Sequence, residues 1–405
     1  MLAHAHPPPG VRATERPALE VADIVRLHGE DFLRAHTVSP HQHAVLRAIA
    51  RCRTEELGGH VDVCDACGYA AISYNSCRDR HCPKCQALSQ ARWIERRMER
   101  VLPTHAFHVV FTLPSELHAL IMANGEKLFD TLFASATEAL LELGRDPRWL
   151  GAELGITSVL HTWTRDLRFH PHVHCIVTGG GLSPDGERWV PTRPDFLFPV
   201  RVLGALFRGK FLARLARLYE RGELHLEGPA APLAKLARWR RLRDKLHRHR
   251  WVVYAKPPFG GPEQVFRYLG RYTHRVGLSN RRLISLDERG VTFRTRGELT
   301  ATLGPQEFLR RFLLHVLPKG FVKIRHHGLM AASNVPTRLA VARRLLGTVA
   351  RPEAPARATG PRDFRDVLLA LTGVDLRRCP RCGALAMSRL PLPFVSLALV
   401  PPDSS

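Results

Sequence analysis

The chain has 405 residues, 45% of them hydrophobic, so it can bury a sizeable core and divide into two or three domains. Its 60 Lys and Arg against 37 Asp and Glu give a formal charge of +23, which favours a nucleic acid partner over an anionic membrane. There is no apolar run of about 18 residues and no secretory signal pattern, so we expect no membrane span and a cytoplasmic location.

The N-terminal part is expected to be helical around a cysteine cluster, and to lead into a first strand and a long helix. The predicted elements are a flexible tail at 1–20, a mostly helical stretch at 21–50, the cysteines of 52–85, an Arg-rich helix at 86–100, a strand at 105–113 and an amphipathic helix at 115–143. The Arg-rich helix is either a phosphate-binding face or an ordinary solvated one.

The remainder of the chain is expected to continue with strands interrupted by helices. The predicted elements are strands at 154–163 and 169–178, a flexible glycine turn at 179–181, basic helices at 199–221 and 231–249, a strand at 251–255, a helix at 262–274, short strands within 281–296 and a strand at 320–325. Because the helices do not alternate strictly with the strands, the pattern predicts an α+β domain with a mainly antiparallel sheet. Beyond 335 we expect a linker and a small tail.

Cysteines are concentrated before the first predicted strand. Cys64 and Cys67 form one Cys-x-x-Cys pair, and Cys82 and Cys85 form another. In a reducing compartment four such thiolates are expected to fill one tetrahedral structural zinc site. Cys77 and His81 lie between the pairs and, with Cys52 and His60, either form a second zinc site or are ordinary local residues. A third pair, Cys379 and Cys382, is a half-site that a distant ligand or another subunit could complete.

Histidines mark one of the predicted strands. In His170-Pro171-His172-Val173-His174, side chains alternate across the strand, so His172 and His174 point the same way. That geometry is typical of a two-histidine metal site. The alternative is a hydrogen-bonded pair on a half-buried strand. His4-Ala5-His6 repeats the pattern in a Pro-rich tail and is given no function.

Two tyrosines lie four residues apart on the predicted helix at 262–274. Tyr268 and Tyr272 would therefore share a helix face, and Arg271 and Arg275 lie beside them, suited to holding phosphate. A phenol is a weak nucleophile at neutral pH. A divalent cation on the histidines would polarise a scissile phosphate, so that a less reactive nucleophile is sufficient. An amphipathic helix that buries its tyrosines is the alternative reading.

Taken together in this order, the cysteine module, the His-apolar-His strand and the Tyr-x-x-x-Tyr helix resemble the double-tyrosine HUH transposases of rolling-circle insertion sequences, the ninety-one family. The resemblance covers roughly residues 21–335 and includes Ser76–Gln86, Phe111–Pro114, His161–Trp163 and Phe169–Cys175. It implies an HUH-type nuclease domain, with a central mainly antiparallel sheet flanked by helices, after a helical zinc-binding module.

The resemblance also implies the chemistry. His172 and His174 would bind magnesium or manganese, and Tyr268 and Tyr272 would attack single-stranded DNA, forming 5′-phosphotyrosine links in rolling-circle transposition. The zinc module would help bind the ends of the element. A third ligand is expected for the cation, and Gln264, His161 and His274 compete for that place.

The implied division is a tail at 1–20, a zinc-binding DNA-binding domain at 21–100, a catalytic domain at 101–335, and a linker and tail at 336–405 that carries the third cysteine pair. The protein would act on DNA in the bacterial cytosol, associated with the nucleoid. Two alternatives stay open, a rolling-circle replication initiator or relaxase, and a zinc DNA-binding protein without catalysis. The sequence does not determine the oligomeric state.

Overall fold

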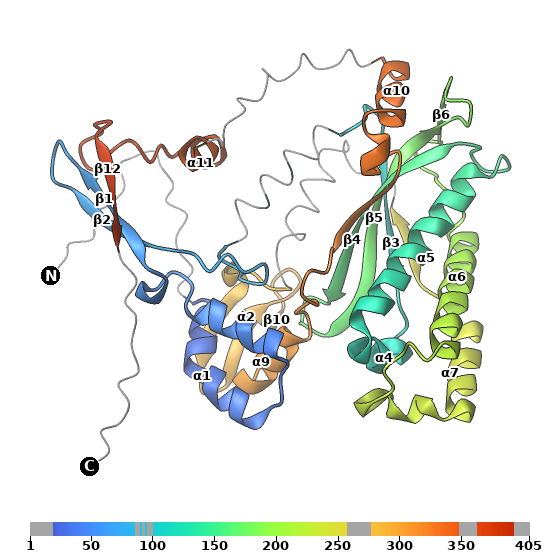
Figure 1. The fold of residues 1–405 in the computed structure, drawn as a ribbon, viewed down its shortest axis with the longest axis horizontal. Helices are drawn as coiled ribbons and strands as arrows, with labels where there is room; N and C mark the ends of the chain where they lie inside the picture. The colour runs from blue at the N-terminus through green and yellow to red at the C-terminus, as the bar shows by residue number, and fades with distance from the viewer. Residues whose placement is uncertain are drawn as a thin grey trace. The chain divides into compact units, whose positions relative to one another are not determined.

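The computed structural model describes residues 19–85, 90, 94, 100–256, 277–347 and 363–392. Its contacts divide the chain into two compact units (Figure 1). The first unit comprises Met1–Ala91, His274–Arg310 and Pro355–Ser405, and the second comprises Arg92–Thr273 and Arg311–Ala354. Each unit is therefore assembled from segments that are distant in sequence, which differs from the linear division expected at residues 100 and 335.

The second unit is built on a six-stranded antiparallel sheet. Five strands follow the order β11-β4-β5-β3-β7, and β6 pairs with the end of β5. Their bounds are β3 Ala106–Thr112, β4 Glu153–Trp163, β5 Phe169–Leu182, β6 Trp189–Pro191, β7 Val253–Lys256 and β11 Ile324–Gly328. Apart from small shifts, β3, β4, β5 and β7 lie where the sequence places them, and β11 begins four residues later than expected. The sequence did not predict β6.

Helices cover one face of this sheet. Figure 1 shows α4 His118–Ala123, α5 Gly125–Arg145, α6 Val200–Glu220 and α7 Leu236–Arg248 on one side of it. Alternate residues of the strands, such as Phe107 of β3 and Val173 of β5, are fully buried in the core with Phe133 of α5 and Phe207 of α6. The period of two along each strand therefore sends the intervening residues, among them the histidines, to the opposite face.

The glycines at 179–181 do not end the third predicted strand, because β5 runs through them to Leu182. A Cβ on Gly180 would lie 2.6 Å from the carbonyl oxygen of Val190, and one on Gly181 would lie 2.6 Å from that of Glu153. Gly180 also has a φ of 147°. The expected flexible turn is wrong, because these glycines serve a close approach of backbones inside the sheet.

The long helix expected at 115–143 is divided. It consists of a 3-10 turn at Ser115–Leu117, then α4, and then α5. Asn124 separates α4 from α5, and its side chain donates to the carbonyl of His225 at 2.9 Å and accepts from the His225 N–H at 2.7 Å. A tertiary contact to a segment 101 residues away therefore overrides the helical periodicity at this point.

The first unit combines several helices with two small sheets. Helices α1 Val21–Ala35 and α2 Pro40–Ala50 open it, and Ser39 caps α2, because its side chain accepts from the Gln42 N–H. Strands β8 Leu283–Asp287, β9 Gly290–Arg294 and β10 Thr300–Leu303 form a meander, followed by α9 Pro305–Leu313. Phe308 of α9 packs edge-on against Phe293 of β9. The sequence predicted neither β10 nor α9.

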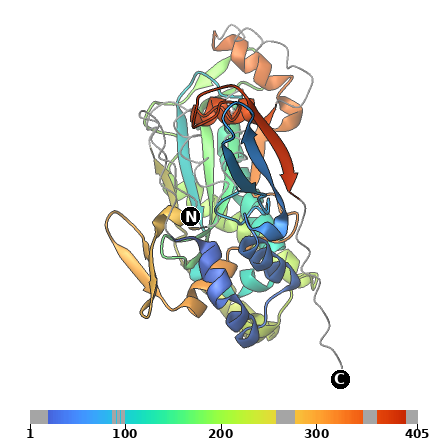
Figure 2. The same cartoon turned by 90° about the vertical axis from the view of Figure 1, so that its left-hand side faces the viewer.

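The other small sheet contains the end of the described chain. It has the order β12-β1-β2, with β1 Gly59–Cys64, β2 Ala70–Tyr74 and β12 Met387–Leu392 (Figure 2). β12 pairs with β1 over six residues, from Gly59 with Leu392 to Cys64 with Met387. The segment expected to be a linker and tail also forms α10 Arg338–Leu345 and α11 Phe364–Thr372. The expected C-terminal tail is thus wrong for this segment, because its backbone completes the cysteine-bearing sheet.

The fold class is α+β, with antiparallel sheets and flanking helices, as the sequence predicts. The helix predicted at 262–274 lies outside the described residues, as does most of the one predicted at 86–100. Among the helices in the described part of the chain, none has the length and apolar character needed to cross a bilayer.

Candidate metal sites

Three histidines meet on the face of the large sheet that points away from α4, α5, α6 and α7. In the register of β4 and β5, His161 lies directly opposite His172, and His174 is two residues further along β5 on the same face. One ring nitrogen from each of the three lies within 4.8 Å of the others. The structure thus brings together the two predicted ligands and adds His161 from the three residues that competed for third place.

The second nitrogen of two of these rings is already committed to a hydrogen bond. Nδ1 of His172 donates to the carbonyl oxygen of His170 at 2.6 Å, and Nδ1 of His174 lies 2.7 Å from Nε2 of His108 on β3. Histidine ligands usually donate their other N–H in this way, which fixes the tautomer and ring orientation. In both rings Nε2 is left as the nitrogen that can coordinate an ion.

All three rings are neutral at physiological pH. Burial lowers the pKa of His172 to about 4, and burial, reinforced by the neighbouring His161 imidazole, holds the pKa of His174 well below its ordinary value. Burial likewise lowers the pKa of His161, with smaller effects from His172 and Lys323. A neutral imidazole offers a lone pair, so the three rings are in the protonation state that metal binding requires.

The donor set fits a divalent transition metal. Metal–nitrogen bonds of about 2.1 Å require neighbouring nitrogens roughly 3.0–3.4 Å apart, which small side-chain rotations would achieve here. Imidazole ligands suit manganese and zinc better than magnesium, which prefers oxygen. Three protein ligands also leave positions for substrate oxygens or water.

Eight of the nine cysteines form two clusters of four. The first cluster is Cys52, Cys77, Cys82 and Cys85, and the second is Cys64, Cys67, Cys379 and Cys382. The expected single set of Cys64, Cys67, Cys82 and Cys85 is therefore wrong, because each of its pairs closes with different partners.

In the first cluster the sulfur of Cys52 lies 3.3 Å from that of Cys85 and 3.6 Å from that of Cys82, and the sulfurs of Cys77 and Cys85 are 3.5 Å apart. A tetrahedral zinc ion with Zn–S bonds of about 2.3 Å separates its sulfurs by about 3.8 Å. These thiols are free and need little adjustment to enclose such an ion.

His81 is not part of either cluster. Its Nδ1 lies 3.0 Å from Oδ1 of Asp79, and its backbone N–H donates to the same oxygen at 2.7 Å. The predicted second zinc set of Cys77 and His81 is thus wrong in its histidine. His60 lies 3.7 Å from a carboxylate oxygen of Asp62 and is likewise outside both clusters.

The predicted nucleophiles and DNA-binding arginines, Tyr268, Tyr272, Arg271 and Arg275, lie outside the described residues. The same holds for Gln264 and His274, the two other residues considered as third ligand.

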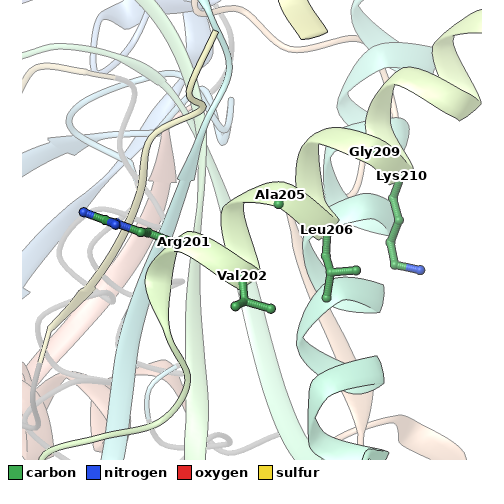
Figure 3. A pocket seen from close by; sticks show the side chains of 6 residues that line it. All are labelled: Arg201, Val202, Ala205, Leu206, Gly209 and Lys210. Carbon is green, nitrogen blue, oxygen red and sulfur yellow. The ribbon is translucent and has the colours of Figure 1, made fainter. Parts of the chain in front are cut away.

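A shallow hollow of about 650 Å³ runs along α6 (Figure 3). Its lining is mostly aliphatic, with one cation at each end, and consists of Arg201, Val202, Ala205, Leu206, Gly209 and Lys210. This lining holds no histidine, cysteine, carboxylate or hydroxyl group, so the hollow is not a candidate for the metal or tyrosine chemistry.

Comparison with known proteins identifies the class. Residues 24–113 match a family model described as "Transposase zinc-binding domain", and residues 155–337 match one described as "Putative transposase". The chain therefore combines a zinc-binding module with a transposase core, and the histidine site lies within that core. No solved structure matches the chain.

Two relatives extend over most of the chain. It is 46% identical over 370 residues to "Putative transposase y4qJ" of Sinorhizobium fredii (strain NBRC 101917 / NGR234), covering 90% of this chain and 92% of the relative. It is 29% identical over 359 residues to "Transposase for insertion sequence element IS801" of Pseudomonas savastanoi pv. phaseolicola, covering 82% and 80%. The chain belongs to the IS91 family of insertion-sequence transposases.

The true partners of Cys64 and Cys67, which the sequence analysis did not identify, carried a local signal. Both Cys67 and Cys382 are followed by glycine, whereas Cys85 is followed by Gln86. Matching the two Cys-x-x-Cys-Gly segments would have grouped Cys64 and Cys67 with Cys379 and Cys382. No comparable signal marked His108, because its role depends on which residue of β5 lies beside it.

Proposed function

We propose that this transposase cleaves and joins single-stranded DNA through covalent tyrosine links, with a divalent cation held by His161, His172 and His174. One observation carries the proposal: three neutral imidazoles converge on one face of a sheet in a chain of this family. A set of three ligands with open positions suits a cation that must also bind substrate.

In the proposed reaction the phenol oxygen of Tyr268 or Tyr272 attacks the scissile phosphorus. The bond from phosphorus to the 3′-oxygen breaks, the phenol proton is lost, and the leaving 3′-oxygen takes up a proton. The product is a 5′-phosphotyrosine link and a free 3′-hydroxyl. A bound manganese or magnesium ion would supply polarisation of the phosphate oxygens. Since the phosphodiester energy is retained, the 3′-hydroxyl of another strand can reverse the step.

This chain's own residues prepare the site for an anion. Burial is the main cause of the lowered pKa of both His161 and His108. The charge of Lys323 lowers the pKa of His161 further, and that of Lys256 lowers the pKa of His108 further. Arg271 and Arg275 are proposed to hold phosphates beside the tyrosines. These cations attract DNA without raising the charge on the imidazoles.

A basic surface on α7 fits a DNA backbone. The helix buries Trp239 and Leu246 and exposes a set of cations: Arg238, Arg240, Arg241, Arg243, Lys245 and Arg248. Such a surface binds phosphates whatever the base sequence. We propose that it contributes to DNA binding within the nucleoid, while the cysteine module contributes to recognition of the element ends.

The test is formation of a covalent adduct. The full chain is incubated with single-stranded oligonucleotides from candidate element ends and manganese, and an adduct that survives detergent is sought. We expect adduct with Tyr268→Phe and with Tyr272→Phe, and none when both are changed. Tyr254→Phe is the matched control, because this exposed tyrosine lies on β7 opposite Val110, on the histidine face.

Two outcomes would contradict the proposal. Absence of adduct with every metal would favour a zinc DNA-binding protein without catalysis. Loss of adduct in Tyr254→Phe alone would assign the nucleophile to β7. A replication initiator or relaxase would form the same adduct, so strand joining between two element ends is measured as well.

A further inference from the structure

Two distant segments fold into the same tight turn with two cysteines, which we call a cysteine knuckle. In Cys64–Gly68 and Cys379–Gly383, the glycine N–H donates to the carbonyl of the first cysteine at 2.9 Å, and the N–H of that cysteine donates to the carbonyl after the glycine at 2.8 Å. Gly68 and Gly383 have φ angles of 68° and 77°, a left-handed conformation that favours glycine. Each knuckle therefore presents two thiols from one tight turn.

The four thiols of these knuckles converge. The sulfur of Cys64 lies 3.7 Å from that of Cys382, and the sulfur of Cys67 lies 3.7 Å from that of Cys379. A disulfide would bring two sulfurs to about 2.05 Å, whereas thiolates around zinc lie about 3.8 Å apart. The observed separations agree with the second arrangement.

The protein backbone itself joins the two knuckles. Strand β12 follows the second knuckle and pairs with β1, which ends at Cys64, and the Asp65 N–H donates to the carbonyl of Ala386 at 2.9 Å. Arg389 grips the carboxylate of Asp62 with two hydrogen bonds of 2.7 and 3.1 Å. Strand pairing and an ion pair thus bring together residues more than 300 positions apart, so the thiol cluster is not an accident of one loop.

We propose that Cys64, Cys67, Cys379 and Cys382 bind a structural zinc ion of their own, separate from one held by Cys52, Cys77, Cys82 and Cys85. Four thiolates complete a tetrahedral sphere and leave no position for substrate, so this ion is structural. It fastens the segment 363–392 to the N-terminal cysteine module. The C-terminal segment is thereby a part of the zinc-binding unit, which the matched region at residues 24–113 does not include.

The proposal is independent of the nuclease chemistry, and metal content tests it. The full chain is prepared with His172→Ala, so that the histidine site does not contribute, and zinc is measured per chain. We expect two zinc ions in this background, one with Cys379→Ser/Cys382→Ser, one with Cys52→Ser/Cys77→Ser, and none with all four changes. Cys175→Ala, which removes the buried cysteine of β5 that belongs to neither cluster, should retain two.

Two further measurements distinguish loss of a zinc ligand from misfolding. Cys382→His should hold two zinc ions, unlike Cys379→Ser/Cys382→Ser, because imidazole also binds zinc. In the zinc-loaded natural chain, the exposed Cys382 should resist alkylation by N-ethylmaleimide, and a chelator should make the four thiols of the cluster reactive together. The proposal fails if Cys379→Ser/Cys382→Ser keeps two zinc ions, or if Cys382 in the zinc-loaded chain reacts as a free thiol.

Discussion

The histidine site and the cysteine module hold their ligands by different means. The histidines lie on β4 and β5, and nine of the eleven residues of β4 are buried in a sheet covered by helices. The cysteines lie on or beside β1, β2 and β12, where β2 has no buried residue and β12 has none either. Hydrophobic burial therefore positions the histidines, whereas the cysteine module has little core of its own.

This difference implies different consequences of metal loss. Structural zinc contributes directly to folding free energy in small modules, by about 10–16 kcal/mol in zinc-finger peptides. A sheet held by packing keeps its geometry without an ion. We therefore expect metal to be needed for folding in the cysteine module and for chemistry alone at the histidines.

The largest expected effect is that of removing metal altogether. A strong chelator should abolish amide exchange protection in β1, β2 and β12 while leaving β4 and β5 protected, because only the former depend on metal for stability. Hydrogen exchange read by mass spectrometry checks this, with re-addition of zinc as the control. Equal loss of protection in β4 would contradict the comparison.

Loss of a histidine ligand should affect activity strongly and stability weakly. We expect His174→Ala to lower the rate of covalent adduct formation by at least about 100-fold, because polarisation of the phosphate is lost. His170→Ala is the matched control: it keeps the backbone carbonyl that accepts from His172 and removes only a neighbouring side chain. Equal effects of the two changes on adduct formation would argue against a cation site formed by His161, His172 and His174.

A smaller effect is expected at His108, which we regard as a positioning residue. With Nε2 of His174 on a cation, its Nδ1–H donates to Nε2 of His108. His108→Phe should therefore weaken manganese binding roughly 10–100-fold. Titration calorimetry measures this, and His118→Phe, which alters an imidazole packed against Phe169, is the control. Unchanged manganese affinity in His108→Phe would show that the contact is only structural.

The smallest expected effect is the pH dependence of stability in the unit built on the helix-covered sheet. Burial lowers the pKa of His315 to about 4, and its Nε2 donates to the carbonyl of Leu167 while Nδ1 accepts from Thr162. Between pH 6.5 and 4 the unfolded chain binds a proton that the folded chain does not, so stability falls as pH drops through this range, by at most about 1.4 kcal/mol per pH unit for this group.

His315→Gln should remove that share of the acid sensitivity. Its melting temperature should lie below that of the natural chain at pH 7, and the difference should shrink at pH 5. Thermal unfolding at the two pH values measures it. A constant difference would mean that His315 does not remain neutral in the folded protein.

Local pattern was sufficient wherever a residue's role depends on its near neighbours. Alternation along 169–178 placed His172 and His174 on one face, and strands interrupted by helices, without strict alternation, predicted the α+β class. Propensity could not foresee that Asn124 would bond to His225 and divide a helix, or that the backbones around Gly180 would approach closely enough to exclude any side chain. These outcomes depend on contacts between distant segments.

The same distinction applies to the metal sites. The sequence by itself determined the types of ligand, thiolate and imidazole, and the pairing of cysteines within each Cys-x-x-Cys turn. Only the tertiary structure decided that His161 faces His172, that His108 supports His174, and that Cys64 and Cys67 join Cys379 and Cys382 and not Cys82 and Cys85. The physical reason is that strand pairing and burial, which bring distant residues together, belong to the folded chain as a whole, whereas spacing records only neighbours.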